Sequence, residues 1–225
     1  MRKKFSRKEI KEDKLVTFYY KSISYFNENR KNLLIGLGAV AIVVLAVFLY
    51  AENKKNNNEK ANVELSRVLP LYDGGSFLEA IEGRPRTPVL GLKKIVEEYG
   101  NTEMGEVAKI YLANAYYFLG KFDEAMKYYE DYGGGNDLFK STALAGQAAC
   151  YEAKDNSEKA AELYKKAASI TNENVLNPQY LLYAGINFIK LGKNDEAKEV
   201  LESAKKNYTA SAYLRDVDRY LAQIQ

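Results

Sequence analysis

The sequence predicts an all-α protein with a single N-terminal transmembrane helix, followed by an α-solenoid of about three helix-turn-helix repeats with flanking helices. Two observations predict this fold. Residues 33–50 read LLIGLGAVAIVVLAVFLY, eighteen uncharged positions in a row. The heptapeptide LGKFDEA at 119–125 returns as LGKNDEA at 191–197. A long uncharged run favours a membrane span, and a turn that recurs within helical sequence favours stacked repeats.

A basic tail, residues 1–31, precedes the predicted span at 32–51. The tail holds ten lysine and arginine side chains and four acidic ones. The positive-inside rule therefore predicts a cytoplasmic tail and an exported C-terminal domain. The uncharged run reaches roughly 27 Å as a helix, close to the thickness of the hydrocarbon core. A cleaved signal peptide is the alternative, but the run begins far from the N-terminus and no small-residue cleavage site follows it.

The tail also has the pattern of an amphipathic helix between residues 9 and 29. Its apolar side chains fall mostly on one helical face: Leu15, Phe18, Tyr19, Ile23 and Phe26. Such a helix can lie on the cytoplasmic leaflet, where basic side chains contact anionic lipid. A plain polar lead-in to the span is an equally open alternative.

Residues 52–86 are predicted to form a juxtamembrane stalk and loop. The stretch AENKKNNNEK at 51–60 is polar and reads as a linker. An apolar helical pattern follows this stretch at residues 63–69, and Pro70 should end or kink that pattern. Three glycines and two prolines in residues 73–88 favour a loop. The repeat domain, residues 87–225, should then begin with a helix that has Pro88 in its first turn, Thr87 as its cap and its end at Gly100.

Three turns with a common spacing organise the rest of the chain. Each turn closes on an alanine, Ala125, Ala160 or Ala197, and these stand 35 and 37 residues apart. A small residue and an aromatic precede each turn: Ala113 and Tyr116, Ala148 and Tyr151, Gly185 and Phe188. This period resembles the tetratricopeptide repeat, a helix-turn-helix unit of about 34 residues. The resemblance implies repeats over about 103–138, 139–173 and 176–209, with a capping helix at 211–225.

The chain departs from the tetratricopeptide pattern at several positions. It contains no tryptophan, and Asp137, Asn172 and Thr209 stand where a proline usually closes the unit. Asp155 occupies the place in the second turn where glycine is usual. The run of three glycines at 133–135 lacks the following lysine of a phosphate loop, so we interpret it as a linker between repeats.

The composition argues against catalysis. The chain has no histidine, which removes the commonest general base and the commonest metal ligand. The acidic pairs at 123–124 and 195–196 begin helices, where carboxylates cap free N–H groups. The lone Cys150 lies in an alanine-rich stretch typical of a buried core. We therefore predict no enzyme activity, no catalytic residues, no cofactor and no metal. The part of the chain after the predicted span is mildly acidic, which argues against nucleic-acid binding.

The family resemblance also implies a binding groove, because alternate faces of the first helices of such repeats line a concave surface. In the register above, the candidate residues are Ile110, Asn114, Tyr117, Phe118, Ala145, Ala149, Glu152, Leu182, Ile186 and Ile189. A rather apolar groove of this kind suits an apolar helix or an extended segment of another protein. The open alternative is that terminal helices fill it.

The whole layout is similar to that of bacterial membrane-anchored tetratricopeptide proteins, typified by the ancillary subunit of the Sec translocon. The resemblance implies a protein-interaction scaffold or chaperone-like adaptor at the inner membrane. Its periplasmic repeat domain would bind translocon subunits, periplasmic chaperones or emerging, unfolded polypeptides. A structural envelope protein that coordinates wall or outer-membrane processes during division is the alternative. An enzyme with an unrecognised site is a third hypothesis.

Overall fold

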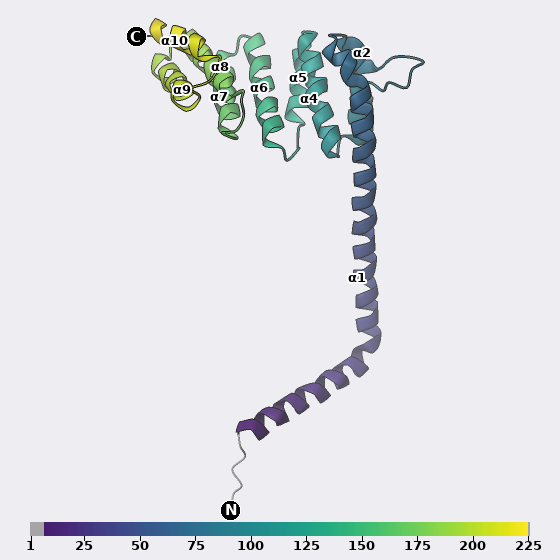
Figure 1. The fold of residues 1–225 in the computed structure, drawn as a ribbon. Coiled ribbons are helices and arrows are strands. Elements are labelled where there is room, and N and C mark those ends of the chain that lie inside the picture. The colour runs from purple at the N-terminus through teal and green to yellow at the C-terminus, as the bar shows by residue number, and fades with distance from the viewer. Residues whose placement is uncertain (1–6, 225) are drawn as a thin grey trace, which may run out of the picture. The chain divides into compact units, whose positions relative to one another are not determined.

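A computed structural model describes the backbone of residues 7–224 and the side chains from residue 14 to residue 224. It divides the chain into two compact units, Met1–Lys54 and Lys55–Gln225. The helices, most of them labelled in Figure 1, are α1 (Arg7–Asp73), α2 (Phe77–Glu82), α3 (Leu92–Tyr99), α4 (Glu103–Phe118), α5 (Phe122–Glu130), α6 (Asp137–Ala153), α7 (Ser157–Ser169), α8 (Asn177–Lys190), α9 (Asn194–Asn207) and α10 (Leu214–Gln223). Within the described residues there is no β-strand, so the predicted all-α class is confirmed.

The first unit contains the N-terminal part of α1. Helix α1 includes an eighteen-residue window with a mean hydropathy of 2.8, and none of that window is buried. The core helix of a soluble protein would be largely covered by other elements, whereas Leu37 and Ile42 are exposed. By length and composition, this is a helix that could cross a membrane or act as a signal sequence.

The structure corrects the expected stalk and loop at 52–86. Helix α1 continues past Pro70 to Asp73, and α2 lies inside the predicted loop. Although this stretch is mostly polar, it is stabilised as a helix because Ala61, Leu65 and Val68 are buried. Pro70 is tolerated because it is exposed in the last turn of α1, and the carbonyl of Ser66, which it leaves unbonded, belongs to an exposed residue and can be hydrated.

The helix expected from Pro88 starts later than predicted. Helix α3 begins at Leu92 and ends before Gly100, so only its end was predicted correctly. Leu90, which precedes α3, is not helical and instead forms an antiparallel bridge with Gly83. A side chain at Gly91 would overlap the carbonyl oxygen of Ile81, which explains why glycine closes the base of this loop.

Three antiparallel helix pairs, α4–α5, α6–α7 and α8–α9, follow one another as a stack of repeats (Figure 1). Their turns share one backbone conformation. Gly120 and Gly192 have φ values of 72° and 71°, and Asp155 has a φ of 58° at the equivalent place. Aspartate is among the few non-glycine residues that tolerate this left-handed conformation. The missing glycine in the second repeat therefore leaves the turn intact.

Small residues bring the helices of each pair together. Ala113 and Ala148 are fully buried, and a side-chain carbon at Gly185 would lie 2.7 Å from Leu201. At the end of the chain, α10 buries Val217 and Leu221 against the last helix pair. Helix α10 thus covers the terminal apolar surface, as a solenoid requires.

Candidate protein-binding face

Helices α4, α6 and α8, the first helices of the three repeats, carry all ten candidate groove residues. Three of them, Ile110, Ala145 and Leu182, are buried and belong to the core. This is a correction, because a partner cannot contact them in this structure. Phe118 is 58% exposed, and the remaining six are half-buried: Asn114, Tyr117, Ala149, Glu152, Ile186 and Ile189. We call these seven accessible residues the repeat face.

Contacts between repeats join the middle of the repeat face. Oε1 of Glu152 on α6 accepts a hydrogen bond of 2.8 Å from Nζ of Lys190 on α8. Its Oε2 accepts one of 3.4 Å from the hydroxyl of Tyr164. Burial raises the pKa of Tyr117, and the nearby acidic groups of Cys150 and Glu152 raise it further. The pair of Glu152 and Lys190 therefore joins the second repeat to the third at the repeat face.

The charge on the repeat face is largely compensated. Glu152 is its one ionisable carboxylate, and Lys190 pairs with it. Asn114 accepts a hydrogen bond of 2.5 Å from the hydroxyl of Tyr129, which commits its amide oxygen to the core. What remains for a partner is mostly aromatic and aliphatic surface from Tyr117, Phe118 and the two isoleucines.

An aromatic cluster extends the repeat face beyond the predicted residues. Phe118 stacks on Phe77 of α2, with ring centroids 4.8 Å apart. Tyr72 of α1 lies edge-on to Tyr111, at 5.0 Å, and to Phe77, at 5.5 Å. Sequence reasoning missed Tyr72 and Phe77 because their segment was expected to be a loop. The apolar spacing of Leu65 and Tyr72 was the available signal.

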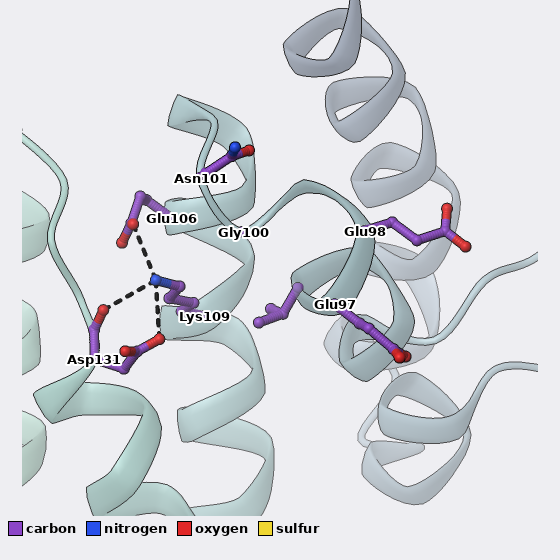
Figure 2. Close-up of a pocket in the computed structure, with 8 residues that line it drawn as sticks. Glu97, Glu98, Gly100, Asn101, Glu106, Lys109 and Asp131 are labelled. Carbon is purple, nitrogen blue, oxygen red and sulfur yellow. Dashed lines mark hydrogen bonds and ion pairs between the residues drawn. The ribbon is translucent and has the colours of Figure 1, made fainter. Parts of the chain in front are cut away.

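A polar pocket, shown in Figure 2, is lined by one lysine, Lys109. The ammonium group of Lys109 contacts Oε1 of Glu106 at 2.9 Å, and the backbone oxygen and Oδ2 of Asp131 at 3.0 Å each. The other oxygen of Glu106 accepts a hydrogen bond of 2.8 Å from the amide of Gly133. Lys109 thus fastens the start of the linker between the first two repeats to α4.

The electrostatics of Lys109 fit this structural role. Burial alone would lower the pKa of its ammonium group, but the hydrogen bonds to Glu106 and Asp131 outweigh burial, and the pKa is raised. By the spacing of the turns, Lys109 stands where the other repeats have Leu144 and Leu181. Because all three N–H groups of the ammonium have partners, we interpret this site as a structural pin. In the part of the chain that the structure describes, no cluster of histidine, cysteine or acidic side chains could hold a metal ion.

Tetratricopeptide-repeat models match residues 110–132 and residues 179–211. The chain contains tetratricopeptide repeats. The matched segments fall on α4–α5 and α8–α9, and the intervening pair has Asp155 at its turn. A search of curated proteins finds no significant match. Repeats of this type stack into extended surfaces that bind other proteins.

Proposed function

We propose that this protein is a membrane-anchored scaffold or chaperone-like adaptor that binds other proteins through its repeat face. One observation carries the proposal: the repeat face offers Tyr117, Phe118, Ile186 and Ile189 beside a compensated Glu152. Accessible apolar side chains with little net charge suit an apolar helix or an extended polypeptide segment. The expected partners are translocon subunits, periplasmic chaperones or unfolded polypeptides.

We further propose that the chain is a single-pass protein of a bacterial inner membrane, with its N-terminus in the cytoplasm and its repeats in the periplasm. The exposed apolar window of α1 and the excess of basic side chains before it support this topology. Membrane lipid is then a second partner, contacted by the anchor and the basic tail.

The topology is tested by adding protease to intact spheroplasts. Digestion of the repeat domain, with survival of a fragment that contains the tail, supports export. A repeat domain that is cut only after the membrane is lysed contradicts it, and the scaffold would then face the cytoplasm.

The repeat face is tested by photocrosslinking in living cells. A photoreactive residue at Ile189 should form adducts with other proteins, and the same residue at Lys198, exposed on α9, serves as the matched control. Replacement of Tyr117 and Phe118 by alanine should weaken the adducts formed from Ile189. Equal adducts from both positions, or adducts unaffected by the two replacements, would contradict binding through this face.

A further inference from the structure

The segment of α1 before the apolar run presents a second apolar surface. Between Lys14 and Lys31 the side chain of Leu15 is 66% exposed and that of Phe18 is 71% exposed. Further large apolar and aromatic side chains of this segment are also exposed: Val16, Tyr19, Tyr20, Ile23, Tyr25 and Phe26. A helix that displays so much apolar surface needs an apolar environment on that side.

The opposite side of the same segment is polar and basic. At 100° per residue, Lys14, Thr17 and Lys21 lie on one side of the helix, and Tyr19, Ile23 and Phe26 lie on the other. The segment has four basic side chains (Lys14, Lys21, Arg30 and Lys31) and one acidic side chain, Glu28. It therefore combines an aromatic face with a net positive charge.

The position of the segment in the chain indicates what covers the aromatic face. Helix α1 continues without interruption from this segment into the uncharged run that begins at Leu33. If that run spans a membrane, the segment starts at the bilayer surface. Tyrosine and phenylalanine favour the boundary between headgroups and acyl chains, and lysine favours anionic headgroups.

We propose that residues 14–31 form an interfacial helix on a bilayer surface that contains anionic phospholipid. The aromatic face lies at the level of the headgroups, and the lysines lie beside lipid phosphates. This inference rests on the membrane anchor in the proposed function. It adds that α1 bends ahead of Leu33, because the segment lies along the membrane plane while the uncharged run crosses it.

The experiment uses single tryptophan reporters, since the chain has no tryptophan of its own. The full chain is reconstituted in phosphatidylcholine vesicles with and without added phosphatidylglycerol. Tyr19→Trp reports the aromatic face, and Thr17→Trp, two residues before it, is the matched control on the polar face. Val43→Trp, within the uncharged run, reports independently whether the anchor is inserted.

We expect the emission of Tyr19→Trp to lie to the blue of Thr17→Trp in anionic vesicles, with quenching by lipid brominated near the headgroup. Replacing Lys14 and Lys21 by glutamine should weaken the interfacial state by about fivefold per lysine in anionic vesicles. If Tyr19→Trp is as exposed to water as Thr17→Trp while Val43→Trp is quenched by deeply brominated lipid, the interfacial helix is overturned and the anchor stands. If Val43→Trp is also exposed to water, the anchor itself fails. Burial of Tyr19→Trp that appears only when a cytoplasmic protein extract is added would overturn the lipid surface in favour of a protein partner.

Discussion

Replacement of Lys109 by alanine should destabilise the repeat domain by about 3 kcal/mol. The side chain of Lys109 is 9% exposed and that of Glu106 is 15% exposed, so their ion pair is largely desolvated. Loss of this pair should lower the free energy of unfolding by about 2 kcal/mol, within the range for hydrogen bonds to charged groups. The contact with the Asp131 carboxylate adds little because that side chain is 63% exposed. Loss of the packed lysine stem adds about 1 kcal/mol.

The measurement is urea unfolding of the full chain in detergent micelles, followed by circular dichroism, with hydrogen exchange at the amide of Gly133. That amide bonds Glu106, so it should exchange faster once the lysine no longer holds the carboxylate in place. Lys109→Leu is the matched variant. It should cost less than Lys109→Ala because Leu144 and Leu181 occupy the equivalent positions. A loss below about 0.5 kcal/mol in Lys109→Ala, with unchanged exchange at Gly133, would refute the structural pin.

Three further outcomes are expected. Asp155→Gly should stabilise the domain by about 0.5 kcal/mol in urea unfolding, because it relieves a left-handed backbone, and destabilisation would contradict this. Gly105→Ala should cost about 2 kcal/mol, since its new side chain would overlap the carbonyl oxygen of Tyr99; unfolding at the native urea midpoint would argue against that overlap. Burial raises the pKa of Tyr164, and raises that of Cys150 from 9.0 to about 11. The unfolded chain therefore loses these protons first, so stability that is full below about pH 9 should fall as the pH rises toward the folded pKa values, and a flat profile up to about pH 11 would contradict this.

The repeats were predictable because the sequence pattern of each helix pair lies within one short stretch of the chain. A small residue such as Ala113 or Gly185 allows close approach of two helices, and an aromatic such as Phe188 fills the space beside it. That alternation, together with a recurring turn, fixes each helix pair almost independently of the rest of the chain. Asp155, in place of the usual glycine, weakens the sequence pattern but adopts the same left-handed backbone conformation as the glycines of the other turns.

The segment 52–86 was not predictable in the same way. Its asparagines, glycines and prolines favour a linker, but Val68 and Ile81 belong to the same buried cluster as Leu112 of the first repeat. The apolar spacing of Leu65 and Tyr72 indicates a helix, but it does not indicate which distant residues that helix contacts. For the same reason the partners of Lys109 could not be foreseen, because Asp131 lies 22 residues away.

For the candidate face, the sequence indicated the side of each helix on which the residues lie, but not how deeply each side chain is buried. A repeat register says which side of a helix a residue occupies, and Tyr117, Glu152 and Ile189 are at least partly accessible there. It does not say how closely the neighbouring helices cover that side. Ile110 and Leu182 are buried because surrounding side chains of their clusters close over them.

The two proposed surfaces should respond differently to salt. On the repeat face the charge of Glu152 is compensated by Lys190, so a partner held there is bound mainly through apolar contact. The segment at 14–31 carries net positive charge and should depend on attraction to anionic lipid. The screening length falls from about 10 Å at 0.1 M salt to about 3 Å at 1 M. Raising the salt should therefore reduce the interfacial burial of Tyr19→Trp while photocrosslinks from Ile189 persist. Loss of the crosslinks on the same salt scale would mean that charge, and not apolar surface, holds the partner on the repeat face.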